Sequence, residues 1–212
     1  MRLAEVLLKG YNAVVSGYFN IKIRLLAEIL STLGSRGNTM LLDPYKLLEK
    51  SGLQVPLREY STAHPGECDL LIVFEPSGEI NLLELAEECS SILVFTTPGS
   101  SVRIPGFFNR ITISRASSGV FIARIRGQRR VVRLRLDEDR VHVVEKPEGV
   151  YARALEVIAG MLSEHGEILV GDAVRAVSHE LGVNRREARL IIYKLVEEGY
   201  LRIKHGRVEA VK

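Results

Sequence analysis

The chain has no tryptophan, only two cysteines and two glutamines, and no long run of apolar residues. A helix that spans a membrane needs about 18 or more consecutive apolar residues, and no segment of this sequence has them. Glu5 places an acid where the basic and apolar start of a secretory signal would lie. We therefore expect a cytoplasmic protein. Arginine outnumbers lysine by 21 to 8, a bias that is compatible with a thermophilic source.

Residues that bind metals or carry out catalysis do not cluster in the sequence. Cys68 and Cys89 are 21 residues apart, and the five histidines do not cluster near them, so we expect two reduced thiols in the core. Asp43, Asp69 and Glu75 lie at the ends of predicted strands, but the sequence offers no nucleophile with a base and an orienting partner. We predict no metal, no cofactor, no catalytic residue and no enzyme activity.

Charge is distributed unevenly along the chain. Residues 1–100 carry 8 basic and 12 acidic groups, a net charge of −4. Residues 101–150 carry 11 basic and 5 acidic groups, a net charge of +6, and ten of those cations are arginine. Residues 151–212 are near balance at +1. The planar fork of donors on arginine suits phosphate, although an arginine-rich segment can also be an ordinary solvated face.

Short apolar runs alternate with helical patterns in the first hundred residues. The run Leu70-Leu71-Ile72-Val73-Phe74 is apolar at every position, which indicates a strand covered on both faces, as in a parallel sheet. The predicted strands, all expected to be buried, are 13–16, 39–42, 70–74 and 91–95. The predicted helices are 21–33, 45–50 and 82–89, with a helix or arm at 3–9 and an irregular segment at 53–67. This alternation predicts a small parallel α/β sheet.

The pattern changes after residue 109. Segments with apolar and polar residues in alternation follow one another, separated by turn residues such as Ser117-Ser118-Gly119 and Gly127-Gln128. They predict an antiparallel β-meander with one arginine-bearing face. Its strands are expected at 110–115, 120–126, 131–136 and 140–144, followed by a linker at 145–150.

The order of these parts resembles a RecA/RadA-type recombinase core. That family has a strand, a phosphate-binding loop, a helix, a strand at the position of Leu70–Phe74 that ends in an acid, a further strand and a terminal β-meander. The segments Asn109–Arg115 and Gly119–Ile125 look similar to the last hairpin of those proteins. The resemblance covers residues ~10–145, and it implies a pared-down paralogue; an unrelated small α/β domain is the alternative.

The phosphate-binding loop itself is missing from this core. The pattern Gly-x-x-x-x-Gly-Lys-Ser/Thr wraps phosphates with backbone amides and holds magnesium with its hydroxyl. Here Gly17 is followed by Tyr-Phe-Asn-Ile-Lys-Ile-Arg, so that only Lys22 can match the pattern, and the second glycine and the hydroxyl are absent. The acid at the end of the third strand is Glu75 rather than the usual aspartate. We predict that the chain does not hydrolyse ATP.

The last third of the chain resembles a winged helix-turn-helix domain. Two helical patterns lead to a third, Asn184–Glu198, which Gly199 ends. Two β-type segments follow, Tyr200–Lys204 and Arg207–Val211, with His205-Gly206 as the turn. The fold class expected for the whole chain is α/β, a small parallel RecA-like sheet with an antiparallel β extension and a C-terminal winged helix domain. The domains are expected at 1–147 and 150–212.

Two groups of cations are predicted to bind DNA. Asn184 can cap the third helix, whose first turns would enter a major groove in helix-turn-helix proteins, and the wing would contact phosphates. In this domain the predicted residues are Arg185, Arg186, Arg189, Arg202, Lys204 and Arg207. In the meander they are Arg124, Arg126, Arg129, Arg130, Arg133 and Arg135; internal ion pairs with the acidic residues of 1–100 are the alternative for this second group.

These features favour a non-catalytic, DNA-binding accessory protein of recombination or repair, associated with the chromosome. The alternative is a transcription regulator whose winged helix binds an operator while the N-terminal domain senses a ligand or dimerises. A protein-binding adaptor is a third class. DNA is the expected partner, with a recombinase or repair factor as a possible protein partner, and the oligomeric state stays open.

Overall fold

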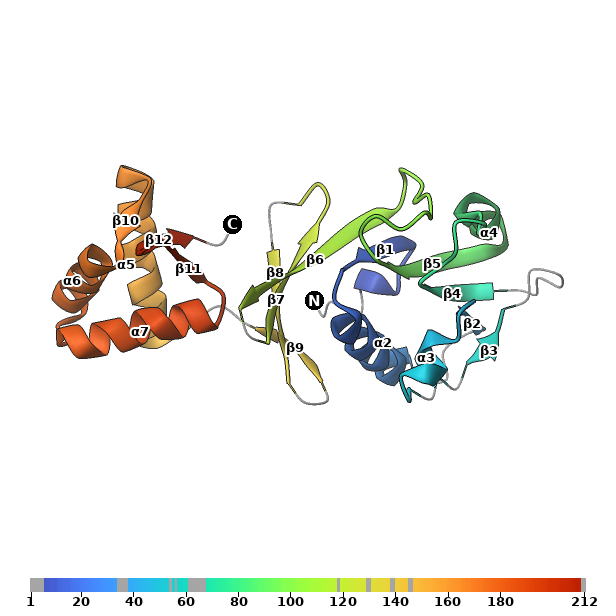
Figure 1. Ribbon diagram of the computed structural model, residues 1–212, viewed down its shortest axis with the longest axis horizontal. Helices are drawn as coiled ribbons and strands as arrows, with labels where there is room; N and C mark the ends of the chain where they lie inside the picture. The colour runs from blue at the N-terminus through green and yellow to red at the C-terminus, as the bar shows by residue number, and fades with distance from the viewer. Residues whose placement is uncertain are drawn as a thin grey trace. The chain divides into compact units, whose positions relative to one another are not determined.

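The structure is a computed structural model. It describes residues 6–33, 38–53, 55, 57–60, 68–117, 119–128, 131–137, 140–144 and 147–210. The fold is mixed α/β, with a large, mostly parallel sheet and helices (Figure 1). No helix in these ranges is long and apolar enough to cross a membrane.

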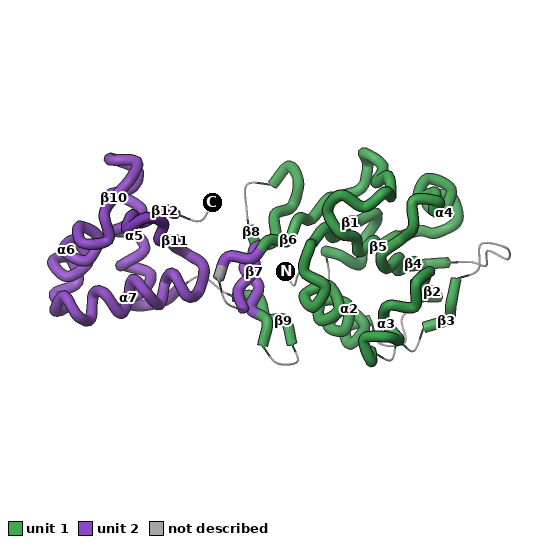
Figure 2. Tube along the Cα trace, viewed as in Figure 1, with its two compact units in different colours: residues 1–114, 123–132, 136–143 green, residues 115–122, 133–135, 144–212 purple. Residues whose placement is uncertain are grey.

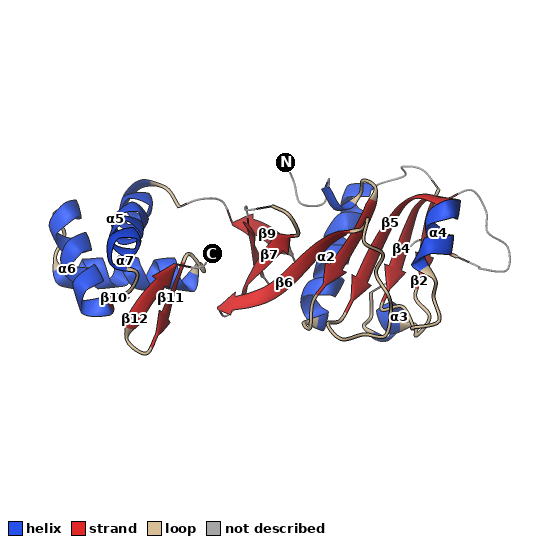
Figure 3. Ribbon diagram, turned by 90° about the horizontal axis from the view of Figure 1, so that it is seen from above, coloured by secondary structure: helices blue, strands red, loops and turns tan. Residues whose placement is uncertain are grey.

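One sheet of nine strands is built from residues 11–144, in the order β3-β2-β4-β5-β1-β6-β7-β8-β9. Each adjacent pair from β3 to β6 is parallel (Figure 3). The remaining strands are joined by loops of two to five residues, too short for a parallel crossover, so they are antiparallel. The strands are β1 Tyr11–Val15, β2 Thr39–Leu42, β3 Arg58–Glu59, β4 Cys68–Phe74, β5 Cys89–Thr96, β6 Asn109–Ser117, β7 Val120–Ile125, β8 Val131–Leu136 and β9 Val141–Val144.

Helices cover both faces of the parallel strands, and this explains the continuous apolar run in β4. The helix α4, Leu82–Glu88, packs its buried leucines with Leu71 and Val73 of β4. Phe74 points to the opposite face, because side chains alternate along a strand. There it contacts Phe19 of α2, Phe19–Leu33, with 5.9 Å between ring centroids. The buried strand predicted at 70–74 is therefore confirmed.

Some predicted details of this half were wrong. All four residues of β2 were expected to be buried, but each is only partly buried. The outer neighbour of β2 is β3, which has only two residues and so covers little of it; this segment was expected to be loop. The helix expected to reach Cys89 ends at Glu88, because Cys89 is the first residue of β5 and lies opposite Cys68 of β4 in the sheet. The short helix α3 spans Leu47–Lys50, inside its predicted range.

The C-terminal third forms a second, smaller core. It consists of three helices and a three-stranded antiparallel sheet of order β10-β12-β11. Ala154, Val177, Ile192 and Val208 from different elements are completely buried in this core. The elements are α5 Gly149–His165, β10 Ile168–Leu169, α6 Val170–Leu181, α7 Arg185–Glu197, β11 Leu201–Lys204 and β12 Arg207–Ala210.

The hairpin β11–β12 turns at His205 and Gly206, which have φ of 48° and 75°. Two positive φ values in a two-residue loop match the twist of the flanking strands, as in a type I′ turn. The predicted hairpin and its turn are confirmed, whereas the two-residue strand β10 was not expected. Its backbone lies against β12, where Ile168 pairs with Val208.

The chain divides into two compact units, which Figure 2 colours separately. The N-terminal unit is residues 1–114, 123–132 and 136–143, and the C-terminal unit is residues 115–122, 133–135 and 144–212. Parts of β6, β7 and β8 thus fall in the C-terminal unit, although these strands are members of the nine-stranded sheet. The sequence alone places these residues in the first domain.

Candidate nucleic-acid interface

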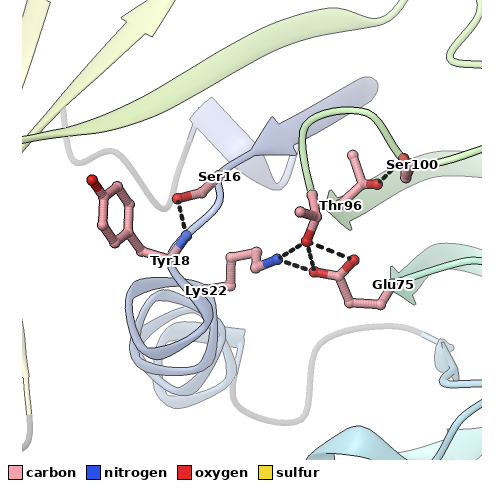
Figure 4. Close-up of polar contacts among 7 residues, drawn as sticks. Ser16, Tyr18, Lys22, Glu75, Thr96 and Ser100 are labelled. Carbon is pink, nitrogen blue, oxygen red and sulfur yellow. Dashed lines mark hydrogen bonds and ion pairs between the residues drawn. The ribbon is translucent and has the colours of Figure 1, made fainter.

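The carboxyl ends of β1, β4 and β5 lie side by side in the N-terminal unit, where a ligand site of a parallel sheet is expected. Glu75 follows β4, Thr97 follows β5, and Lys22 comes from the first turns of α2. Lys22 Nζ forms an ion pair with Glu75 Oε1 and donates a hydrogen bond to Thr97 Oγ1 at 2.8 Å (Figure 4). Thr97 Oγ1 in turn donates to Glu75 Oε1 at 3.0 Å.

This cluster places its charges inside the protein. The Lys22 side chain is 1% exposed and the Glu75 side chain 14% exposed. Glu75 also has a φ of 45°, which non-glycine residues rarely adopt, and its amide donates to the Phe95 carbonyl oxygen at 2.8 Å. The charge of Lys22 is therefore neutralised by Glu75 within the protein.

The loop between β1 and α2 is short. Only Ser16, Gly17 and Tyr18 separate Val15 from Phe19, and Ser16 Oγ accepts a hydrogen bond from the Tyr18 amide at 3.2 Å (Figure 4). A loop of this length has too few backbone amides to surround a phosphate as the eight-residue pattern does. Among the described residues, no group of three or more His, Cys, Asp or Glu side chains could hold a metal.

The helix α7 presents its charges outward. Asn184 Oδ1 accepts a hydrogen bond from the Glu187 amide at 2.9 Å, and Glu187 Oε2 accepts one from the Asn184 amide at 3.3 Å. This reciprocal capping box fixes where the helix begins. Arg185, Arg186 and Arg189 follow directly and are exposed. Within the described ranges, none of the three forms an ion pair.

The hairpin cations are exposed as well, but they differ in their partners. Arg202 and Lys204 lie on β11, where Arg202 is opposite Glu209 and Lys204 is opposite Arg207. Arg207 forms an ion pair with Glu167 of the C-terminal unit. Lys204 and Arg207 therefore place two cations beside the His205-Gly206 turn, one of them already paired with a carboxylate.

The meander arginines differ in exposure and fall in two different units. Arg124 lies on β7 and Arg126 in the turn that follows it; both are exposed, with buried Ile125 between them. Arg124 donates to Ser114 Oγ at 3.2 Å within the N-terminal unit. Arg133 and Arg135 belong to the C-terminal unit. Arg129 and Arg130 lie outside the described residues.

Arg133 has an internal role. Its Nε donates to the Gly199 carbonyl oxygen at 3.1 Å, and its guanidinium lies 4.4 Å from the centroid of the Tyr200 ring. Burial lowers the pKa of Arg133 and raises that of Tyr200. Gly199 has a φ of 73°, and a Cβ added there would approach Val120 Cγ1 to 3.0 Å. Arg133 thus fixes the start of the hairpin to the meander segments of its own unit.

Sequence reasoning missed Thr97 and the partners of Arg133. Thr97 follows a predicted strand, so aligning the carboxyl ends of neighbouring parallel strands could have placed it beside Glu75. The partners of Arg133 are 66 and more positions away, and no local pattern indicates them.

The exposed arginines of α7 offer hydrogen-bond donors and positive charge to an anionic partner. At the carboxyl ends of β4 and β5, by contrast, Glu75 and Lys22 are already paired with each other.

A scan of protein-family models and a search of curated proteins find no match to this chain.

Proposed function

We propose that the chain is a non-catalytic, DNA-binding accessory protein of recombination or repair. In this proposal the N-terminal unit is a RecA/RadA-like core that has lost its phosphate loop, and the C-terminal unit contains a winged helix-turn-helix domain. The observation that carries the proposal is the capped start of α7, where three exposed arginines follow Asn184.

The geometry of α7 supports binding to DNA in particular. The first turns of a helix-turn-helix recognition helix enter the major groove, and the planar fork of donors on arginine suits the phosphates that border the groove. Arg185, Arg186 and Arg189 occupy these turns, and the neighbouring hairpin carries Arg202 and Lys204. The order of α5, α6, α7 and the hairpin is the order expected of a winged helix.

The order of the N-terminal elements supports the second part of the proposal. A strand, a short loop, the helix α2, a buried strand ending in an acid, a further strand and a β-meander follow one another as the resemblance implies. The ion pair of Lys22 and Glu75 stands where the two halves of a nucleotide and magnesium site would meet. This arrangement favours a structural core over a catalytic one.

The proposal is tested by the affinity of the full chain for a short duplex, a single strand of the same sequence and a four-way junction, each at several salt concentrations. We expect binding with little sequence preference. Changing Arg185, Arg186 and Arg189 together to alanine should weaken binding by at least about tenfold. The salt slope should fall by about three, roughly one for each phosphate that the variant no longer neutralises.

A matched control is the pair Arg153→Ala and Arg175→Ala, which removes exposed arginines from α5 and α6. It should leave the affinity and the salt slope as they are. A preference for one duplex sequence by about three or more orders of magnitude would favour a transcription regulator. Absence of binding to all three DNA forms would overturn the proposal and favour a protein-binding adaptor.

A further inference from the structure

A cleft of about 660 Å³ lies in the N-terminal unit, between the segments 78–83 and 103–107. Its lining includes Ile80, Ile104 and Pro105, and two large side chains at its mouth are exposed, Leu83 by 54% and Phe107 by 51%. The cleft is preformed, because Phe107 packs edge-on against Tyr11 with 5.2 Å between ring centroids.

Ser101, two residues before the second wall, lies close to Gly78 of the first wall. A Cβ added at Gly78 would lie 2.6 Å from Ser101 Oγ, so the segments that carry the walls are in close contact. An apolar surface that is held open in this way, with large side chains exposed to water, is typical of an interaction site.

The surroundings of the cleft are acidic. Glu79 lines it, and Glu84 and Glu87 are exposed on α4 beside Leu83. Arg103 is the cation that lines it, on the opposite wall. A partner for this surface should therefore bring bulky apolar side chains flanked by positive charge.

The helix α7 has this character on its exposed face. Arg186, Arg189, Leu190 and Tyr193 are spaced by three and four residues, which places them on one side of a helix. Leu190 is 61% exposed and Tyr193 50% exposed, so two large apolar side chains face water on this side of α7. A phosphate backbone alone gives no reason for an exposed leucine beside arginines.

We propose that the cleft of one copy of this chain binds the exposed face of α7 of a second copy. Leu190 and Tyr193 enter the cleft beside Leu83 and Phe107, while Arg186 and Arg189 face the carboxylates of α4. Because two different surfaces meet, one copy of a pair still has an unused cleft and the other an unused α7. Further copies can bind to these surfaces, so the assembly grows into a chain or closes into a ring. Contacts between exposed charges are screened by salt, so the association weakens as salt rises.

One consequence rests on the proposed function. Arg186 and Arg189, which face the carboxylates of α4 in this assembly, are among the residues proposed to bind DNA, so α7 cannot do both at once. Added duplex DNA should then dissociate the assembly, and self-association should lower the apparent affinity for DNA at high protein concentration.

The test is sedimentation velocity of the full chain without DNA, over a range of concentrations. We expect wild-type chains to associate with rising concentration. Two charge-reversed variants, Glu84→Arg with Glu87→Arg and Arg186→Glu with Arg189→Glu, should each remain monomeric, since cleft and helix then carry the same sign. A mixture of the two should associate again, because each variant supplies the surface that the other lacks.

This restoration also shows that both variants are folded. A wild-type chain that stays monomeric at every concentration overturns the proposal. This outcome also covers binding of α7 to the cleft of its own chain, which would leave no surface for a second copy. Variants that associate as well as the wild type, or a mixture that stays monomeric, overturn it too. A chain that associates in this way but binds no DNA contradicts the proposed function and leaves the self-association intact.

Discussion

Lys22 and Arg186 both lie in the first turns of a helix, and their surroundings differ completely. Lys22 of α2 is 1% exposed and paired with Glu75 at the edge of a parallel sheet. Arg186 of α7 is exposed beside two further arginines, and the helix start is secured by Asn184 and Glu187 instead. A charge that is buried and paired contributes to the fold, whereas an exposed and unpaired charge is available to a ligand.

The comparison separates two uses of the same type of residue. In the N-terminal unit, the cation at the sheet edge is held by groups from two neighbouring strand ends, so binding a phosphate there would require the ion pair to break. In the C-terminal unit, the backbone and the capping residues satisfy the helix start, and the arginines remain accessible. Arg133 lies between these cases, because it is half-buried and bound to a carbonyl oxygen and a ring of its own unit.

The largest effect on stability is expected from Lys22→Met. Removing one member of a buried ion pair leaves its partner uncompensated, and we expect a loss of about 3 kcal/mol, the lower end of the usual range, because Glu75 keeps some contact with water. Urea unfolding of the full chain, followed for the N-terminal unit, measures this loss in the free energy of unfolding. The double variant Lys22→Met with Glu75→Gln should lose less, since no charge remains buried. A single variant as stable as the wild type would show that the pair contributes nothing to the fold.

A smaller effect is expected from Arg133→Ala. The variant loses a charge-assisted hydrogen bond and a cation–π interaction, together about 2 kcal/mol. Hydrogen exchange of β11 should accelerate, because the start of the hairpin is no longer held. The control Arg124→Ala removes an exposed arginine and should leave this exchange unchanged. If Arg133→Ala weakened DNA binding as much as the α7 variant and left β11 protected, Arg133 would belong to the DNA surface.

The smallest effect is expected from Asn184→Ala. Loss of the helix cap should cost about 1 kcal/mol, measured by thermal unfolding of the C-terminal unit. Asn184→Ser keeps a capping side chain and should retain most of that stability. DNA affinity should change much less than in the arginine variant, because the cap positions the helix and carries no charge. An affinity loss equal to that of the arginine variant would mean that Asn184 itself contacts DNA.

The predictable parts of this fold are those with a strong local pattern. The run Leu70–Phe74 could be identified as a fully covered strand because each residue is apolar. The start of α7 could be identified because Asn184 and Glu187 have the spacing of a capping box. Both features depend on residues that are close in the sequence.

The parts that could not be predicted depend on contacts between distant segments. Strand β3 has two residues, Arg58 and Glu59, and exists only because β2 lies beside it. Cys68 and Cys89 are free and buried as expected, but the register of β4 and β5 also places them opposite each other, and burial raises the pKa of both thiols. In the same way, an alternating pattern assigned Arg133 to a polar face without revealing Gly199 and Tyr200.

The central claim is that ligands meet the exposed cations of α7 and not the buried lysine of the sheet edge. Hydrogen exchange of the full chain, measured with duplex DNA and separately with magnesium and ATP, tests both halves together. The account predicts that DNA protects the start of α7 and the β11–β12 hairpin, and that ATP leaves the exchange of residues 16–22 unchanged. Protection of residues 16–22 by ATP, or protection by DNA that is confined to the N-terminal unit, would contradict it.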